Sequence, residues 1–173
     1  MAIKKPNSAV FYGLIAGGCM ILFTFILYRG GIDLYISKIA YLGYVISIGL
    51  AAMATLAQKK ANGGWLEFRA ALRTAFTVLV ITLAAQTLFT WVLLNFIDPH
   101  FKEILTRAVL VNDAQAMKRF GISDDEAART IALERGKDLF SLGAMSLSLA
   151  SVCIVHFIIA LLIAAIIKKK KSE

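Results

Sequence analysis

The chain contains four long apolar stretches, and none of them carries an Asp, Glu, Lys or Arg side chain. They cover residues 9–28, 39–57, 75–97 and 143–167, so each is 19 to 25 residues long. A helix of about 20 apolar residues is long enough to cross the roughly 30 Å hydrocarbon core of a bilayer. Of the 173 residues, 59% are hydrophobic and only 17% are charged, which excludes an ordinary soluble domain. The sequence therefore predicts an all-α integral membrane protein with four transmembrane helices.

The segment 98–142, between the third and fourth spans, is the one long connection. Asp98 followed by Pro99 is typical of a helix start, and Ser123 predicts the capped start of a second helix after Gly121. The expected apolar faces of the two helices hold Phe101, Ile104, Leu105 and Ala108, and then Ala128, Ile131 and Ala132. About 45 residues cannot bury an independent core. We therefore expect residues 1–173 to form a single membrane domain with a two-helix amphipathic insertion.

Charge is distributed unequally between the two sides of the predicted spans. The N-terminus, the segment 58–74 and the C-terminus together carry ten basic and two acidic side chains, whereas the segments on the other side carry nine of each. The whole net charge of +8 therefore falls on one side. Lys and Arg close to helix ends stay on the cytoplasmic side. We expect a multi-pass protein of the bacterial inner membrane, with both termini cytoplasmic and 98–142 periplasmic.

Two features are expected at the cytoplasmic membrane surface. Trp65 follows a glycine turn and is expected, with Phe68, in an interfacial turn of helix that leads into the third span. A basic run that attracts anionic lipids follows the fourth span and consists of Lys168, Lys169, Lys170 and Lys171. No aromatic and basic surface typical of nucleic-acid binding accompanies these charges. The expected partner is therefore the lipid bilayer and not a nucleic acid.

Two strongly polar side chains lie deep in the predicted spans, Gln86 in the third and His156 in the fourth. An ionisable residue inside a membrane is a candidate functional residue. One interpretation makes His156 a proton relay or a ligand contact, since a histidine side chain can gain or lose its proton near neutral pH. The other makes it a neutral imidazole that holds helices together through Gln86, Thr82 or Ser151. We favour the second, because no intramembrane carboxylate or second histidine continues a relay.

Small side chains mark the faces through which the helices are expected to pack, because they let helix backbones approach closely in lipid. These faces comprise Gly13, Gly17, Met20 and Thr24 in the first span, Gly43, Ser47, Ala51 and Ala54 in the second, and Ser146, Ala150, Cys153, His156, Ala160 and Ala164 in the fourth. The two cysteines, Cys19 and Cys153, stand alone and behave as small apolar residues. No metal site and no cofactor is indicated.

Four short motifs carry a resemblance to a known family. They are Tyr-Gly-Leu-Ile-Ala-Gly at 12–17, Gly-Trp-Leu-Glu-Phe at 64–68, Phe-Ile-Asp-Pro-His-Phe at 96–101 and Gly-Ile-Ser-Asp-Asp-Glu at 121–126. As a set they resemble an uncharacterised bacterial family of four-helix inner-membrane proteins, a domain of unknown function frequent in Bacteroidota. The resemblance transfers no catalytic residue. It implies an accessory role beside membrane-linked glycosyltransferases in envelope glycolipid synthesis.

Three classes of function remain. We expect a non-enzymatic accessory or scaffold subunit of an inner-membrane assembly, which binds another membrane protein or a second copy of itself. The alternative is a small oligomeric transporter or channel that uses Gln86 and His156 at the membrane midplane. A lipid-modifying enzyme is disfavoured, because the sequence offers no nucleophile, metal site or paired carboxylates. The first two classes differ in whether polar residues of several helices converge on a hydrated cavity.

Overall fold

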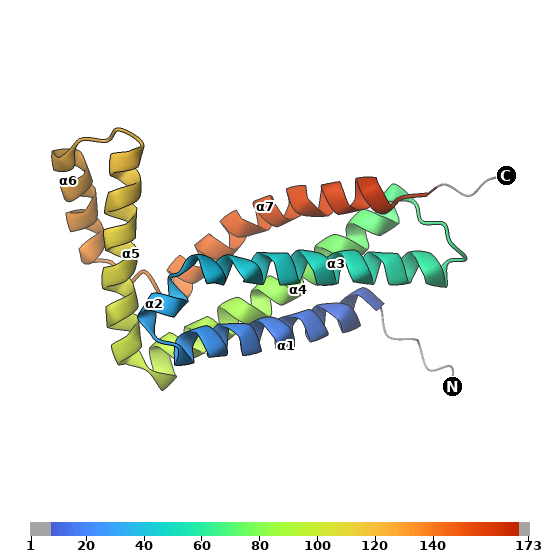
Figure 1. Cartoon of the computed structure of the whole chain (residues 1–173), viewed down its shortest axis with the longest axis horizontal. Coiled ribbons are helices and arrows are strands. Elements are labelled where there is room, and N and C mark those ends of the chain that lie inside the picture. Colours follow the sequence, from blue (N-terminus) through green and yellow to red (C-terminus); the bar gives the residue numbers. More distant parts are fainter. Residues whose placement is uncertain (1–7, 170–173) are drawn as a thin grey trace.

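The computed structural model describes residues 8–169, which form helices joined by short turns (Figure 1). The long helices are α1 (Ser8–Arg29), α3 (Leu42–Ala61), α4 (Phe68–Val92), α5 (Pro99–Arg119), α6 (Asp124–Arg135) and α7 (Leu142–Ile167). Three short elements connect or extend them: α2 (Ile32–Tyr35), the 3₁₀ helix η1 (Lys38–Tyr41) and the π-helical turn η2 (Leu93–Ile97). Within residues 8–169 the only strand-like pairing is an isolated antiparallel bridge between Leu66 and Lys169.

Four of these helical stretches are long and apolar enough to cross a membrane, at 9–29, 38–61, 68–97 and 142–167. The protein is therefore an all-α membrane protein with the four predicted spans. The helix of the third span, α4, begins at Phe68, seven residues before the start of the predicted span at residue 75. Arg69 and Arg73 lie in its first turns. The lack of charge marks the part of a helix that lies in lipid, and not the start of the helix itself.

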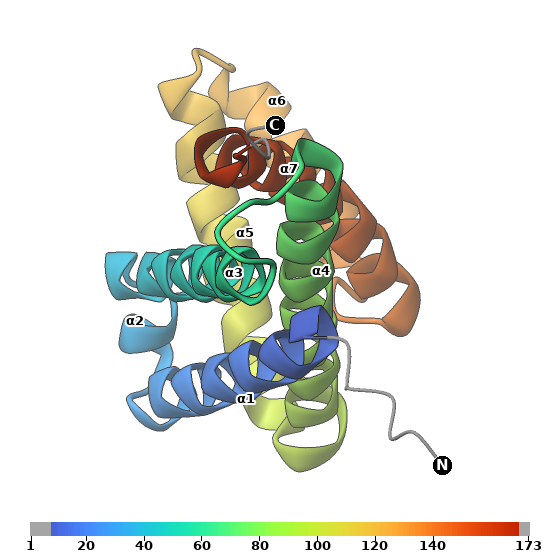
Figure 2. The same cartoon turned by 90° about the vertical axis from the view of Figure 1, so that its right-hand side faces the viewer.

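The four long apolar helices run alternately up and down, and α4 contacts each of the other three (Figures 1 and 2). The first turn of α1, the α3–α4 connection and the last turn of α7 lie at one end of the bundle. We call this the α3–α4 end. The helices α2, α5 and α6 lie at the opposite end, which we call the α5 end. In Figure 2 the first turns of α7 and the helix α3 lie on opposite sides of α4. From there α7 is tilted, so that its last turns lie closer to α3.

Small residues bring the helices together, as the sequence predicts. A Cβ atom added to Gly13 would lie 2.9 Å from the Cβ of Ile81, and one added to Gly17 would lie 2.9 Å from the Cβ of Ala85. The buried core toward the α3–α4 end comprises Ala9, Ala16, Ala51, Ala54, Ala75, Val78, Leu79, Ala160, Ile163 and Ile167. The predicted inward face of α7 is confirmed for its second half but is wrong for its first half, where Ser146 and Ala150 are exposed. The tilt of α7 takes those turns away from the core.

The α3–α4 end is closed by contacts between the α3–α4 connection and the end of α7. Leu66 and Lys169 exchange two backbone hydrogen bonds of 2.9 Å, and Lys59 Nζ donates to the carbonyl of Ile167 at 2.7 Å. Gly63 and Gly64, with φ of 76° and 89°, form the predicted turn before this bridge. The interfacial turn of helix predicted with Trp65 and Phe68 is wrong at Trp65, which is not helical and precedes the bridge of Leu66 with Lys169. It is confirmed at Phe68, where α4 begins.

The helices α5 and α6 form an antiparallel pair at the other end. The Asp98 carboxylate accepts from the Phe101 backbone N–H at 2.9 Å and from the Tyr28 hydroxyl at 2.9 Å, so it caps α5 and holds it against α1. Both hydrogen bonds hold the pKa of Asp98 below its usual value. In α6 the buried apolar residues include Ala127 and Ile131, whereas Ala128 and Ala132, predicted on the same face as Ile131, are exposed.

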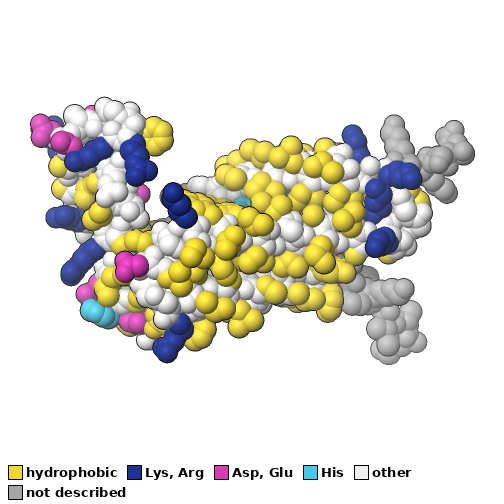
Figure 3. Space-filling view, viewed as in Figure 1, with side chains coloured by type: hydrophobic (Ala, Val, Ile, Leu, Met, Phe, Trp, Pro, Cys, Tyr) yellow, Lys and Arg dark blue, Asp and Glu magenta, His cyan; other side chains and the backbone are white. Residues whose placement is uncertain are grey.

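Charged and apolar side chains occupy separate parts of the surface (Figure 3). On the face shown, apolar side chains cover much of the bundle between its two ends. On the same face, Lys and Arg side chains appear without Asp or Glu at the α3–α4 end, whereas both signs of charge appear on α5 and α6. On this face a wide, mostly uncharged region therefore separates the two charged ends.

Candidate functional site

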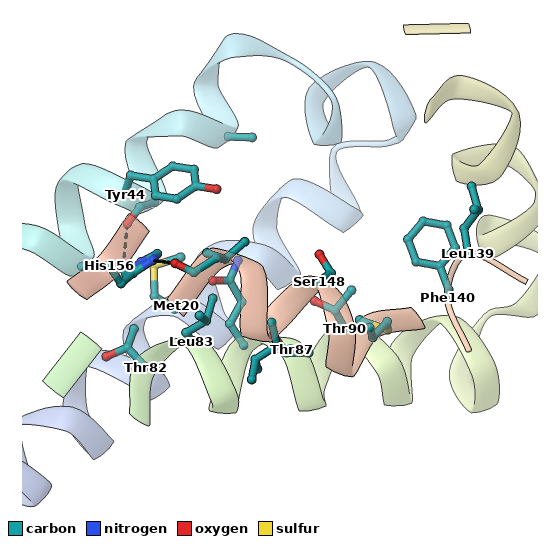
Figure 4. A pocket seen from close by; sticks show the side chains of 17 residues that line it. Met20, Tyr44, Thr82, Leu83, Thr87, Thr90, Leu139, Phe140, Ser148 and His156 are labelled. Atoms are coloured by element: carbon teal, nitrogen blue, oxygen red, sulfur yellow. Dashed lines mark hydrogen bonds between the residues drawn. The ribbon is translucent and has the colours of Figure 1, made fainter. Parts of the chain in front are cut away.

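A cavity of about 360 Å³ lies inside the bundle, with α4 as its floor and α3 and α7 as its walls. Its polar lining residues are Tyr44, Ser47, Thr82, Gln86, Thr87, Thr90, Ser148 and His156. Figure 4 shows His156 with Tyr44 and Thr82 at one end, and Leu139 and Phe140 at the other. The cavity is therefore an elongated slot, which we call the intramembrane slot. It extends from the middle of α7 toward the α5 end of the bundle.

The inner end of the slot is formed by His156, whose side chain is only 3% exposed. Its Nδ1 atom lies 2.9 Å from the carbonyl oxygen of Val152, one turn earlier in the same helix. A carbonyl only accepts hydrogen bonds, so Nδ1 carries the proton and Nε2 of the neutral ring is an acceptor. The partners predicted for His156 (Gln86, Thr82 and Ser151) are wrong, because its ring bonds to its own helix. The ring of Tyr44 lies 6.1 Å away across the slot.

Gln86 lies on the floor of the same slot. Its Nε2 atom donates to the Thr24 hydroxyl of α1 at 3.4 Å, which ties α4 to α1. In this orientation of the amide, its Oε1 atom has no hydrogen-bond partner within residues 8–169. The fold thus brings Gln86 and His156, from different helices, to one cavity.

Three hydroxyl groups that line the slot form no hydrogen bond within the described part of the chain. They belong to Tyr44 of α3, Thr87 of α4 and Ser148 of α7. By contrast, the hydroxyls of Ser47 and Thr82 donate to carbonyls one turn earlier, at 2.8 Å each. No fully buried side-chain nitrogen or oxygen lacks a partner in residues 8–169. The three unpartnered hydroxyls therefore reach open space, where water or a ligand can satisfy them.

The outer end of the slot is bounded by the connection between α6 and α7. Asn95 donates to the Phe140 carbonyl at 3.0 Å and accepts from Lys102 Nζ at 2.8 Å. The same ammonium forms an ion pair of 2.8 Å with Asp138. This ion pair holds the pKa of Asp138 below its usual value. The network fixes the turn that carries Leu139 and Phe140 at the mouth of the slot.

The hydroxyl of Thr90 is engaged at this outer end with Tyr35 of α2. Burial raises the pKa of Tyr35, and a hydrogen bond with Thr90 partly offsets that rise. Thr90 therefore offers less free hydrogen-bonding capacity to the slot than Thr87 does.

The residues predicted at the membrane surface lie together at the α3–α4 end. Trp65 is partly buried, Lys169 forms the bridge to Leu66, and Lys168 Nζ lies 5.7 Å from the centre of the Phe68 ring. Lys170 and Lys171 lie outside the described residues. Within residues 8–169, no group of three or more His, Cys, Asp and Glu side chains could hold a metal ion.

A second, more open hollow of about 1010 Å³ lies between α5 and α6. Its lining combines apolar residues, among them Leu110 and Ile131, with exposed charges such as Arg107 and Arg135. Lys102 and Asp138 also line it, so the ion pair at the slot mouth forms a wall of this hollow.

Sequence reasoning missed Tyr44, Thr87 and Ser148, because isolated hydroxyls are common in membrane helices. A signal was nevertheless present in α4. Thr82, Gln86 and Thr90 follow one another at intervals of four residues and therefore share one helix face. A polar face confined to one half of a span predicts a polar recess on that side of the membrane.

Four membrane-length helices around a polar intramembrane slot, with a helical pair at one end, define a small multi-pass α-helical membrane protein. Residues 11–169 match the family described as "Protein of unknown function (DUF4199)", and the chain belongs to this family. The resemblance to an uncharacterised family is thereby confirmed. Comparisons with curated proteins and with solved structures found no match.

Proposed function

We propose that this protein is a non-enzymatic accessory protein of the bacterial inner membrane whose slot binds the polar part of a small amphipathic molecule. One observation carries the proposal: neutral polar side chains from three helices converge on a single intramembrane cavity. A volume of about 360 Å³ falls within the usual range of ligand pockets. In the envelope glycolipid systems that the family resemblance implies, such a protein would hold a lipid beside a partner enzyme.

The chemistry of the lining favours binding over catalysis. Its 17 residues include one titratable imidazole, one phenol and no carboxylate, ammonium or thiol group. Nucleophilic catalysis needs a nucleophile within hydrogen-bonding reach of a base. Within residues 8–169 the imidazole of His156 bonds to the Val152 carbonyl and to no hydroxyl of the slot. Hydroxyl, amide and imidazole groups without a charged partner are suited to holding a polar ligand by hydrogen bonds.

The direct test is to identify small molecules that remain bound when the protein is extracted with its native lipids in polymer nanodiscs. We expect mass spectrometry to find one amphipathic class enriched over the bulk lipid. Ser148→Trp fills the slot and should remove it. Ser151→Trp is the matched control, since Ser151 is also exposed on α7 but does not line the slot. Equal lipid content in wild-type and Ser148→Trp protein would contradict the proposal.

We place the α3–α4 end in the cytoplasm and α5 and α6 in the periplasm. The support is the excess of Lys and Arg at the α3–α4 end. Single cysteines at Asn62 and Ser123, in a Cys19→Ala/Cys153→Ala background, test this orientation in intact cells. We expect an impermeant maleimide to label position 123 alone. Labelling at position 62 from outside would reverse the orientation.

A second candidate function is a small oligomeric transporter that uses Gln86 and His156. It is favoured by the polar path that the slot forms from the α5 end to His156. One chain alone provides no path beyond that point, because Ala51, Val78 and Ala160 of the next turns are buried in the core. An assembly would have to supply the second half. Uptake of a solute into liposomes that contain only this protein would favour the transporter over the accessory function.

A further inference from the structure

The lining of the slot restricts the chemistry of what it can hold. Building on the binding function proposed above, we propose that the slot takes the uncharged, hydroxyl-bearing head of a membrane lipid, inserted with a hydroxyl toward His156. Four properties of the slot carry this: its lack of charge, its acceptors, its free hydroxyls, and its size and opening.

Charge is the first property. None of the 17 lining residues is Asp, Glu, Lys or Arg. Moving an ionised group out of water without a partner of opposite charge is strongly unfavourable. Two charged residues at the mouth, Lys102 and Asp138, form an ion pair of 2.8 Å and neutralise each other. The slot therefore disfavours phosphate, carboxylate and ammonium heads and accepts neutral ones.

Hydrogen-bonding acceptors at the inner end are the second property. His156 Nε2 is an acceptor because Nδ1 donates to Val152, and Gln86 Oε1 is free because Nε2 donates to Thr24. Both groups belong to residues that line the slot. A ligand that reaches this end must bring a hydrogen-bond donor. An ester or ketone oxygen cannot do so, whereas a hydroxyl group can.

The free hydroxyls along the slot are the third property. Those of Tyr44, Thr87 and Ser148 come from three different helices and can each donate or accept. A head with several hydroxyl groups can satisfy them by acting as donor to some and acceptor to others. A head with a single hydroxyl would leave most of this capacity to water.

Size and opening are the fourth property. A volume of about 360 Å³ corresponds to roughly 12 water molecules, so the slot holds a glycerol or sugar-sized head and not an entire lipid. Tyr44 and Ser148 are exposed on the walls, where α3 and α7 face the apolar surroundings of the bundle. A lipid chain attached to the head can leave the slot between these helices and stay in the leaflet.

The experiment compares three probes that share one chain and differ only in the head: 1-monooleoylglycerol, methyl oleate and oleate. Native mass spectrometry of the detergent-solubilised full chain at pH 8 measures how much of each is retained. Hydrogen bonds in membrane helices are weak, so we expect about three- to tenfold more monooleoylglycerol than methyl oleate, and oleate retained least. Equal retention of monooleoylglycerol and methyl oleate would overturn the inference.

Variants connect the preference to the slot. His156→Phe and Gln86→Met keep the side-chain volume and remove the acceptor, so each should bring the ratio of monooleoylglycerol to methyl oleate close to one. Ser151→Ala is the control, since the Ser151 hydroxyl donates to Leu147 of its own helix, outside the slot. Gln86→Met serves alone if His156→Phe does not fold. An unchanged ratio in a folded acceptor variant would refute the assignment of the acceptors.

Failure of this inference differs from failure of the proposed binding function. If Ser148→Trp removes a native molecule but the three probes are retained equally, the slot binds a ligand of different chemistry, and only this inference falls. If no probe is retained and Ser148→Trp leaves the native lipid content unchanged, both fall.

Discussion

The same four helices pack in two different ways along their length. Toward the α3–α4 end, alanines such as Ala51, Ala54 and Ala160 are fully buried in one apolar core. Toward the α5 end, α3 and α7 separate over α4, and the intramembrane slot lies between them. Side-chain volume accounts for the closed half, because small residues allow close backbone contact. In the open half, polar side chains line the space that the separated helices leave.

The difference shows how a membrane protein keeps a polar recess stable. A hydroxyl or amide in lipid needs a hydrogen-bond partner, and in the open half part of this need is met internally, as by Thr82 with Val78 and by Gln86 with Thr24. The closed half contributes packing that does not depend on any ligand. Each half should therefore respond differently to added volume.

The largest expected effect is for added volume in the closed half. Ala54→Phe inserts a ring where no space exists, so we expect a loss of about 3 kcal/mol in the free energy of unfolding. Ser148→Phe places the same ring in the slot and should change that free energy by less than about 0.5 kcal/mol. Unfolding in mixed micelles, followed by circular dichroism, measures both. Equal losses would mean that the two halves are packed alike.

A smaller effect tests whether α1 packs tightly on α4 beside the slot. Gly17 packs on Ala85, next to the slot residue Gln86 but on the α1 side of α4, and an added Cβ would lie 2.9 Å from the Ala85 Cβ. We expect Gly17→Ala to cost about 1 kcal/mol. Gly18→Ala is the matched control, because nothing lies within 4 Å of its added Cβ. If both variants keep wild-type stability in the same unfolding assay, the α1–α4 contact is looser than this structure indicates.

The smallest effect concerns the ion pair at the mouth of the slot. Because Lys102 lowers the pKa of Asp138, the pair stabilises the fold above pH 4 or so, and this contribution is lost as the pH falls through the lowered pKa. Both partners are partly exposed, at 22% and 49%, so the effect should stay below about 1 kcal/mol. Spin labels at Asn112 and Leu147 should show the distance between α5 and α7 broadening at pH 3.

Asp138→Asn should show that broadening already at pH 7 and little further change on acidification. Glu103→Gln is the control, because Glu103 forms no ion pair within the described residues and its loss leaves the Lys102–Asp138 pair intact. A distance distribution that changes neither with pH nor in Asp138→Asn would show that the ion pair does not position the turn at the mouth of the slot, and that the backbone and Asn95 are sufficient.

The spans could be predicted from the sequence because the bilayer imposes a simple rule on length and charge. The helix starts at Pro99 and after Ser123 were equally readable, since the side chains of Asp98 and Ser123 accept from the backbone three residues later. The direction in which the first half of α7 faces could not be predicted, and Ser146 and Ala150 are exposed there. Its hydropathy is high all around the helix, so no apolar stripe distinguishes the inner side from the lipid side.

Only some of the residues that line the slot could be predicted from the sequence. Gln86 and His156 stand out because strongly polar residues are rare in spans, and both line it. Their hydrogen-bond partners depend on side-chain rotamers and helix tilts, which residue spacing does not predict. His156 therefore bonds to Val152 and not to Gln86, whose amide bonds to Thr24. Tyr44 and Ser148 acquire their place only because α7 crosses α4 at an angle.

The contacts at the α3–α4 end give α7 the geometry of a lever. The helix is fixed at Ile167 by Lys59 and at Lys169 by Leu66, while its first turns reach the far side of the molecule. Its 26 residues span about 39 Å, so a rotation of only about 5° about the fixed end moves the other end by about 3 Å. Ser148 lies on that far arm, so the width of the polar recess depends on the angle of α7 at the α3–α4 end as well as on the contacts of Asn95 and Lys102 at the mouth.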